Sequence, residues 1–381
     1  MGEQKGQIEE SLIRWFEWFH SHPELSYQEY ETTAKIRAIL LENGIEILQY
    51  DLETGLVAMI RGEKEGPVQI LRCDIDALPI QEETGLSYAS ECEGRMHACG
   101  HDFHITAGIG CALLLQQKRK ELCGTVKIIF QPAEESSLGA LMILKTDVMH
   151  DVDFAWGFHT DPTNDVRVFG IREGYVTAAV DRFVIRIKGA GCHGAHPEDG
   201  VDPIPVAAAV VQALHTIPGR NINAFHPSLI SVTRMQAGNT WNVIPETAEL
   251  EGTVRTMDKK DRAFYEKRLY EIAHNTAEAY GASAETEWIA GPPATYNDAR
   301  MAGYSIRKAQ ECGFNVVPEE SSLGGDDFSF YEAEIPGCYL KIGTGKGAAI
   351  HQPEFSVSKG VICMAAEYLA VLMLDIRELV L

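Results

Sequence analysis

Hydrophobic and polar positions along the first 180 residues predict helices that alternate with buried strands. Apolar side chains recur at helical spacing over 8–19, and further helical patterns cover 30–42 and 105–117. Continuous apolar runs, which are typical of strands covered on both faces, occupy 56–60, 68–73, 125–130 and 153–158. Helices that alternate with such strands predict an α/β domain whose sheet is mixed but largely parallel.

The pattern changes near residue 180, where the strands begin to carry one apolar and one polar face. Alternation is seen between the apolar positions Phe183, Ile185 and Ile187 and the basic positions Arg182, Arg186 and Lys188. A helical pattern over 203–217 follows. Next come two strands, a helix and a strand, over 229–236, 247–256, 260–280 and 283–289. The order β-α-β-β-α-β is that of the ferredoxin-like fold. We therefore expect residues 180–290 to be inserted into a discontinuous domain of residues 1–179 and 291–381.

Composition and charge narrow the classes of partner. The 381 residues include 33 Lys and Arg against 55 Asp and Glu, which gives a net charge of −22. So acidic a chain disfavours non-specific binding to nucleic acid or to an anionic membrane. Its apolar runs fall well short of the ~20 residues that span a bilayer, and the first residues contain no apolar signal segment. We expect a cytoplasmic protein without nucleic-acid or membrane partners.

Nine cysteines are present, an odd number at irregular spacing, which does not indicate a disulfide framework. One of them, Cys99, lies with three histidines in the segment 97–104. Cys99 and His101 are two positions apart in what we expect to be an extended loop, so their side chains would point the same way. A thiolate and an imidazole together suit Zn²⁺ or another borderline metal. A core thiol beside hydrogen-bonded loop histidines is the alternative interpretation.

Three further polar sites come after predicted strands: the pair Glu134 and Glu135, then His159, then His351. Open α/β sheets bind their ligands at the carboxyl ends of strands. Adjacent carboxylates diverge, so one can hold a metal while the other acts as a general base on water. Taken alone, each site could be a solvated loop or a structural histidine. Together with Cys99, the sites predict a catalytic metal centre.

The segment 189–194 matches the dinucleotide-binding pattern G-x-G-x-x-G. That pattern holds a pyrophosphate only where a helix begins at the third glycine, and Pro197, Pro203 and Pro205 argue against a helix there. The G-x-S-x-G motif of a serine nucleophile does not occur. Nucleotide binding and serine hydrolysis are therefore disfavoured.

Motifs that carry a family resemblance extend over nearly the whole chain. They are His22–Ser26, Asp74–Pro79, Met96–His101, Phe130–Glu135, Gly157–His159, His193–Ala195, Asn242–Pro245, Glu251–Thr256 and Asp326–Phe328. In these segments the chain resembles the amidohydrolase branch of the dinuclear metallopeptidase family. That branch includes hippurate hydrolases, aminoacylases, N-acetyldiaminopimelate deacetylases and plant indole-acetyl-amino-acid hydrolases. Cys-Gly-His followed by Pro-Ala-Glu-Glu is very specific to it.

The resemblance implies a cofactor of two divalent metal ions per subunit, which could be Mn²⁺, Zn²⁺, Ni²⁺ or Co²⁺. It also implies that Cys99 lies between the two metals. The ligands that it implies are Cys99, His101, Glu135, His159 and His351.

The same resemblance implies roles for residues around the metals. Glu134 would be the general base, and Asp76 would be an orienting carboxylate. His193 would stabilise the oxyanion, often across a dimer. Asn242 and Arg255 would bind substrate together with His193. The inserted residues 180–290 would then serve as a dimerisation or lid domain.

We therefore predict a metal-dependent amidohydrolase, an enzyme that acts on linear amide C–N bonds. It would cleave N-acyl amino acids to a carboxylic acid and a free amino acid by attack of a metal-bound water. Its expected partners are this small-molecule substrate and a second copy of the chain in a homodimer. Two alternatives are a dipeptidase or carboxypeptidase of the same family, and a catalytically idle metal- and ligand-binding protein.

Overall fold

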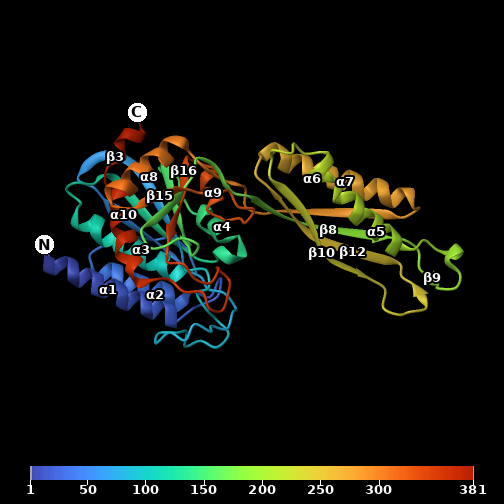
Figure 1. Ribbon diagram of the computed structural model, residues 1–381, viewed down its shortest axis with the longest axis horizontal. Coiled ribbons are helices and arrows are strands. Elements are labelled where there is room, and N and C mark those ends of the chain that lie inside the picture. The colour runs from blue at the N-terminus through green and yellow to red at the C-terminus, as the bar shows by residue number, and fades with distance from the viewer. Residues whose placement is uncertain (1, 381) are drawn as a thin grey trace. The chain divides into compact units, whose positions relative to one another are not determined.

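The structure is a computed structural model that describes residues 2–380 and divides into two units along the chain (Figure 1). The larger unit comprises the described residues up to Val176, then Tyr296–Glu320, then those from Asp327 onward. The smaller unit comprises Thr177–Thr295 and Ser321–Asp326. Because the chain leaves the larger unit and later returns to it, the smaller unit is an insertion.

A mixed sheet of eight strands lies at the centre of the larger unit, in the order β1-β2-β4-β3-β5-β16-β6-β15. The four strands β4, β3, β5 and β16 are parallel to one another, whereas β2 and β6 pair with them antiparallel. This arrangement confirms the mixed, largely parallel sheet. The strands are β1 (Glu46–Leu48), β2 (Leu56–Arg61), β3 (Lys64–Asp74), β4 (Cys123–Gln131), β5 (Phe154–Asp161), β6 (Val168–Ile171), β15 (Asn315–Pro318) and β16 (Gly337–Gly343).

Helices cover both faces of this sheet, because its central strands bury side chains on both faces. Leu71 of β3 packs into a cluster with α1, α2, α3, α8 and α10, while the adjacent Ile70 packs into a second cluster with α4 and α9. Helix α3 contacts α1, α10 and the sheet, so it is buried along most of its length. The helices are α1 (Gly2–Ser21), α2 (Tyr30–Glu42), α3 (His101–Gln117), α4 (Gly139–Leu144), α8 (Ala299–Glu311), α9 (Ser329–Glu332) and α10 (Ile362–Leu374).

The smaller unit contains an antiparallel sheet in the order β10-β12-β8-β13, with α5 and α7 packed against its apolar face. Along the chain these elements follow the predicted order β-α-β-β-α-β. The expected helix over 203–217 is interrupted at His215, and Pro218 in the next turn lacks the backbone donor that a continuous helix would need. The elements are β8 (Ala179–Lys188), α5 (Pro203–Leu214), α6 (Thr216–Arg220), β10 (Ser228–Ala237), β12 (Thr247–Thr256), α7 (Lys259–Ala279) and β13 (Ser283–Ala290).

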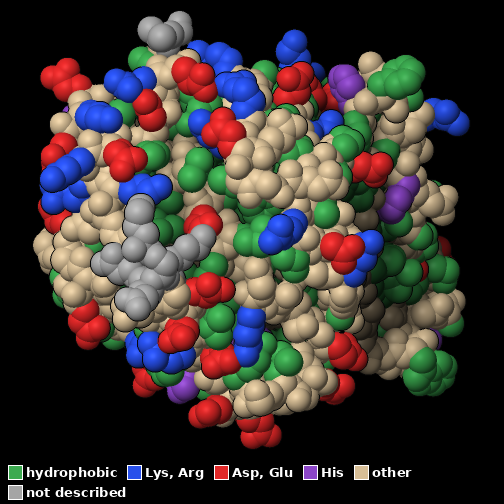
Figure 2. All heavy atoms as spheres, turned by 60° about the vertical axis from the view of Figure 1, so that its left-hand side comes forward, with side chains coloured by type: hydrophobic (Ala, Val, Ile, Leu, Met, Phe, Trp, Pro, Cys, Tyr) green, Lys and Arg blue, Asp and Glu red, His purple; other side chains and the backbone are tan. Residues whose placement is uncertain are grey.

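Two short two-stranded sheets complete the structure. One pairs β9 (Cys192–His193) with β11 (Val243–Ile244), and the other pairs β7 (Gly174–Thr177) with β14 (Thr295–Asn297). Among the described residues, the helices lack the combined length and apolarity that crossing a bilayer requires. On the face shown in Figure 2, acidic and basic side chains are interspersed.

Candidate metal centre

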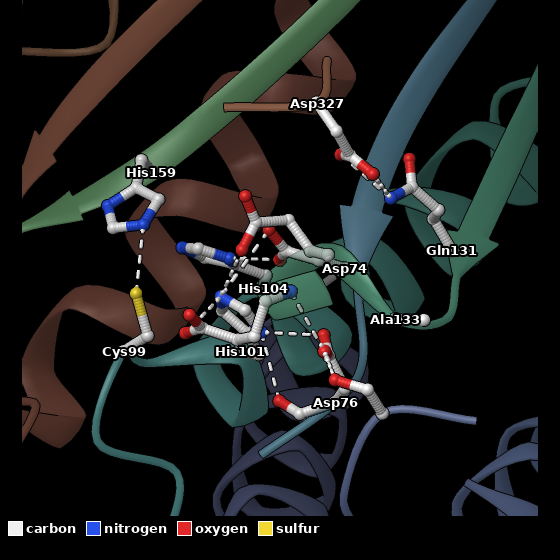
Figure 3. Close-up of polar contacts among 12 residues, drawn as sticks. Asp74, Asp76, Cys99, His101, His104, Gln131, Ala133, His159 and Asp327 are labelled. Atoms are coloured by element: carbon white, nitrogen blue, oxygen red, sulfur yellow. Dashed lines mark hydrogen bonds and ion pairs between the residues drawn. The ribbon is translucent and has the colours of Figure 1, made fainter. Parts of the chain in front are cut away.

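The predicted metal ligands meet near the carboxyl ends of the central parallel strands. Figure 3 labels three of them, Cys99, His101 and His159. The predicted ligands form two overlapping groups, in each of which the donor atoms lie within 4.8 Å of one another. One group is Cys99, His101 and His159, and the other is Cys99, Glu135 and His351. Since the Cys99 sulfur belongs to both groups, the donor set fits two cations that share this sulfur.

A tight turn before α3 presents Cys99 and His101 on the side of β5. Gly100 has a φ of +82°, and a Cβ atom there would lie 2.4 Å from Cγ2 of Thr160. Glycine therefore satisfies both the left-handed conformation and the close approach to β5. Our prediction that Cys99 and His101 lie in an extended loop is wrong, because His101 is already the first residue of α3.

Cys99 is 5% exposed, and its sulfur lies 3.3 Å from Nε2 of His159. Burial raises the pKa of the thiol well above its usual value, although the nearby His101 opposes this rise. The thiolate that binds metals is therefore disfavoured here without a compensating positive charge. A bound cation would supply that charge and displace the proton.

The imidazole of His101 is held in one tautomer. Its Nδ1 lies 2.9 Å from the backbone oxygen of Asp76 and 3.2 Å from that residue's carboxylate. A carbonyl oxygen only accepts, so Nδ1 carries the proton. Nε2 is buried and has no hydrogen-bond partner among the described residues, as expected of a nitrogen oriented to hold a metal.

Two further imidazoles complete the donor set. Nδ1 of His159 donates to its neighbour's backbone oxygen, that of Thr160, at 2.9 Å, while Nε2 faces Cys99. His351 adopts a left-handed conformation with a φ of +65°, and its backbone N–H donates to the oxygen of Ala98 at 2.8 Å. Its Nε2 lies 3.4 Å from Oε1 of Glu135. A hydrogen bond to the backbone thus orients the ring of His159, and one from its own backbone N–H fixes the main chain of His351.

The adjacent carboxylates of Glu134 and Glu135 both approach the same imidazole. An oxygen of each lies 4.0 Å from Nε2 of His101, so the two side chains diverge less than we expected. Oε1 of Glu135 is buried and has no hydrogen-bond partner among the described residues. The backbone N–H of Glu135 donates to the carboxylate of Asp76 at 3.0 Å. Asp76 therefore orients both His101 and Glu135.

Asp74, Arg72 and His104 support the site and were missed by the sequence analysis. Nδ1 of His104 hydrogen-bonds Asp74, and its Nε2 accepts the backbone N–H of Thr160 at 3.1 Å. With both nitrogens engaged, His104 orients β5 rather than offering a metal ligand. Burial alone would raise the pKa of Asp74, but the Arg72 guanidinium at 2.5 Å and the neighbouring histidines hold it well below its usual value. An arginine inside an apolar strand pattern was the available signal.

In the smaller unit, the sheet of β9 and β11 presents an exposed His193. His193 pairs with Val243, and the backbone N–H of Gly194 donates to the oxygen of Asn242 at 2.9 Å. The backbone N–H of Ala195 donates to Nδ1 of His193 at 3.0 Å. A backbone N–H only donates, so in the neutral ring Nδ1 accepts and Nε2 carries the proton. The ring therefore offers an N–H donor at Nε2.

Arg255 is not brought together with His193 and Asn242. Along β12, Thr247 pairs with the last residue of β8, whereas Arg255 pairs with Val180 near its beginning. At about 3.3 Å per residue, about 26 Å of strand separates Thr247 from Arg255. Asn242 precedes Thr247 in the chain, at the end of β12 opposite to Arg255, so these predicted substrate-binding residues do not meet within one copy of the smaller unit. Burial lowers the pKa of Arg255, although Asp181 opposes this change.

Comparison with known proteins identifies relatives along nearly the whole chain. The family model described as peptidase family M20/M25/M40 matches residues 70–375. An N-acetylcysteine deacetylase of Bacillus subtilis is 44% identical over 360 residues, which cover 94% of this chain and 95% of that protein. The thermostable carboxypeptidase 1 of Saccharolobus solfataricus is 34% identical over 369 residues, which cover 94% of each chain.

A solved structure has the same fold. It is a dinuclear metal-binding peptidase of the M20 family from Bacillus subtilis. The two structures superpose with a TM-score of 0.89 at 41% sequence identity, and the match covers 98% of this chain and 99% of that one.

Proposed function

Since the chain belongs to peptidase family M20/M25/M40 and is a metal-dependent amide hydrolase, we propose that it cleaves N-acyl amino acids. The products are a carboxylic acid and a free amino acid. The observation that carries this proposal is the cluster of donors around the buried Cys99, with a second carboxylate, that of Glu134, beside it. The N-acetylcysteine deacetylase among the relatives supports this substrate class.

We propose that the donor set would hold two divalent cations, with Cys99 among their ligands. The residues that hold them are Cys99, His101, Glu135, His159 and His351. Sulfur, nitrogen and oxygen donors together suit Zn²⁺, Co²⁺, Ni²⁺ or Mn²⁺. When bound, such cations supply Lewis acidity, which polarises the amide carbonyl and lowers the pKa of water.

Glu134 is the general base in this proposal. Its carboxylate takes one proton from the attacking water, and the oxygen forms a bond to the amide carbon. As the C–N bond breaks, Glu134 returns the proton to the leaving nitrogen, so the carboxylate is regenerated. Asp76 contributes by orienting His101 and the backbone of Glu135.

His193 is the proposed donor to the oxyanion, and we propose that it acts on a second copy of the chain. The N–H at Nε2 suits this role, because a hydrogen-bond donor directed at the oxyanion stabilises its developing negative charge. His193, on the sheet of β9 and β11, and Arg255, on β12 of the four-stranded sheet, lie too far apart in one chain to contact the same small N-acyl amino acid. If both bind substrate, one comes from each copy, which supports a homodimer formed through the smaller unit.

A carboxypeptidase activity is the second candidate, favoured by the likeness to the thermostable carboxypeptidase. It needs the same cluster and differs in the group acylating the terminal amino acid.

The nine cysteines are all free thiols, which supports the reducing cytoplasm as the proposed compartment.

A substrate screen by mass spectrometry tests this function. Metal-reconstituted protein is incubated with N-acetyl and N-benzoyl amino acids, N-acetylcysteine among them, and with dipeptides. We expect release of the free amino acid from the N-acyl substrates, loss of turnover with a chelator and recovery with a divalent cation. Turnover of dipeptides alone favours the carboxypeptidase, and full activity in metal-free protein contradicts both.

A further inference from the structure

Glu29 is a buried carboxylate that lies next to the loop of Glu134 without forming part of the metal centre. Its side chain is 0% exposed. Oε1 accepts the backbone N–H of Ala133 at 2.8 Å, and Oε2 accepts the hydroxyl of Thr54 at 2.8 Å. Both donors are neutral. A buried ionisable group with such partners has a high desolvation penalty, so its position calls for an explanation beyond packing.

The neighbouring Glu24 performs the task that Glu29 would otherwise have at the start of α2. Glu29 occupies the position before the first residue of the helix, yet its side chain does not cap the helix. Glu24 accepts the N–H groups of Glu31 and Thr32 instead, at 3.1 and 2.8 Å. The carboxylate of Glu29 is therefore available to reach Ala133, which lies more than a hundred residues away in sequence.

Ala133 needs to be held in place because its backbone is strained. Its φ of +56° lies in the left-handed region, which is unfavourable for an L-residue other than glycine. Ala133 immediately precedes Glu134, so a relaxed φ would swing the Glu134 side chain. A hydrogen bond to an ionised acceptor is roughly twice as strong as a neutral one, and can hold this conformation.

Two carboxylates thus hold the backbone on either side of Glu134. Glu29 accepts the N–H of the preceding residue, Ala133, and Asp76 accepts the N–H of the following residue, Glu135. We propose that Glu29 is a positioning residue for Glu134, which it fixes through the N–H of Ala133. This inference rests on the proposed function, in which Glu134 is the general base.

The ionisation state of Glu29 changes near neutral pH, so its effect on Ala133 can be followed by varying the pH. Burial, reinforced by the charge of Asp76, raises the pKa of Glu29 to about 7, although its hydrogen bonds, including those from Thr54 and Ala133, oppose the rise. The other groups that contact its carboxylate, from the segments after β4 and before β2, are uncharged. Below that pH the protonated oxygen can donate to Thr54, and Ala133 keeps only a neutral acceptor.

The test compares three variants of the metal-loaded protein. Glu29→Ala should lower kcat on an N-acyl amino acid by about 10²-fold, the effect of a displacement of about 1 Å, and change KM little. Bound metal should be unchanged. Glu29→Gln, whose amide oxygen can still accept from Ala133, should keep most of kcat. On the acidic side of its plot of kcat against pH, the fall near pH 7 that protonation of Glu29 causes in the parent protein should be absent. Glu24→Ala, the matched control, should lower thermal stability without changing kcat.

Hydrogen exchange of the Ala133 amide gives a readout that is independent of activity. Exchange in the segment 131–137 should be faster in Glu29→Ala than in the parent protein, and near the parent rate in Glu29→Gln. If Glu29→Ala does not fold, the pH profile and exchange of Glu29→Gln carry the test. Three results for Glu29→Ala would overturn the inference: an exchange rate equal to that of the parent protein, a kcat equal to that of the parent, or loss of bound metal. For Glu29→Gln, the contradicting result is a fall of kcat on the acidic side that is the same as in the parent. A parent protein inert on every N-acyl substrate overturns the proposed function instead, while exchange still reports on the hold on Ala133.

Discussion

The candidate residues of the two units differ in how they are held. In the larger unit Cys99, His101 and Asp76 are buried, and distant segments of the chain fix their orientation through hydrogen bonds. In the smaller unit His193 and Asn242 are exposed and rest on a short two-stranded sheet. The first arrangement is a rigid set of donors, and the second presents one N–H group to its surroundings.

This difference indicates what each unit can contribute. In a buried site, charges interact strongly and an unpaired polar atom is destabilising, so the unprotonated Nε2 of His101 is suited to hold a cation. An exposed imidazole has water as a partner and requires no ligand in order to be stable. His193 can therefore gain a role only where another group excludes that water.

The sharpest test of the larger unit separates the two adjacent carboxylates. Glu134→Gln should retain both metals but lose turnover towards the upper end of about 10²–10⁴-fold, because the amide cannot accept the proton of water. Glu135→Gln should weaken metal binding, because a neutral group replaces a charged ligand. Metal content by elemental analysis and kcat on an N-acyl amino acid distinguish the two.

Because the carboxylates of Glu134 and Glu135 lie equally close to His101, the distances alone do not distinguish the general base from the metal ligand. Metal loss from Glu134→Gln with retention in Glu135→Gln would exchange the two roles. Full activity in both variants would remove this loop from the chemistry.

The smaller unit is tested by removing its exposed donor. His193→Ala should lower kcat by about 10²–10³-fold, as expected for loss of one oxyanion donor, and leave the metals in place. His196→Ala is the matched control, since His196 packs against the same ring with centroids 5.7 Å apart and should leave kcat near that of the parent.

Mixing two inactive variants tests whether His193 acts on a second copy. When equal amounts of Glu134→Gln and His193→Ala exchange subunits, about half of the dimers contain one chain of each variant. In such a mixed dimer, the His193→Ala chain supplies Glu134 and the Glu134→Gln chain supplies His193, so one of the two sites is intact. About a quarter of the parent activity should therefore return. Absence of any recovery, in dimers shown by native mass spectrometry to be mixed, places His193 and Glu134 of one chain at the same site or removes His193 from catalysis.

How far the sequence could predict these features depends on the range of the interactions. The parallel sheet and the cluster around Cys99 follow from local patterns, because polar residues at parallel strand ends converge. The supporting contacts of Asp74 with His104 and of Glu29 with Ala133 join segments distant in sequence, and local patterns do not encode them. The separation of Arg255 from His193 follows from strand register, which the motif positions alone do not convey.

A buried histidine in the larger unit should make stability depend on pH. Burial alone would lower the pKa of His20, but Asp102 at 2.6 Å and Glu82 at 3.2 Å outweigh it and raise the pKa to about 9. The stabilisation is complete below the ordinary pKa of 6.5 and is lost as pH rises through about 9. His20→Gln should therefore cost roughly 3 kcal/mol at pH 6 and much less at pH 9.5.

Urea unfolding at the two pH values measures this difference. The exposed pair of His226 and Asp261 in the smaller unit, 2.7 Å apart, is the matched control, and His226→Gln should cost less than about 1 kcal/mol. A cost for His20→Gln that does not fall between pH 6 and pH 9.5 would show that its partners do not hold a proton on the imidazole.

The smallest expected effect tests whether the two units unfold as one. Asp258 caps α7 in the smaller unit by accepting the N–H groups of Lys260 and Asp261, at 2.7 and 3.2 Å. Asp298 caps α8 in the larger unit in the same way, at 2.9 and 3.1 Å. Replacing either aspartate with alanine should cost about 1 kcal/mol, because two helix N–H groups lose their acceptor.

Calorimetry of the two cap variants then distinguishes two cases. If each unit unfolds on its own, Asp258→Ala lowers only the transition of the smaller unit and Asp298→Ala only that of the larger. If the units unfold together, both variants lower one shared transition by similar amounts. Since each unit has its own buried core, we expect two transitions. A single transition that both variants shift equally would mean that the inserted unit depends on the larger one for its stability.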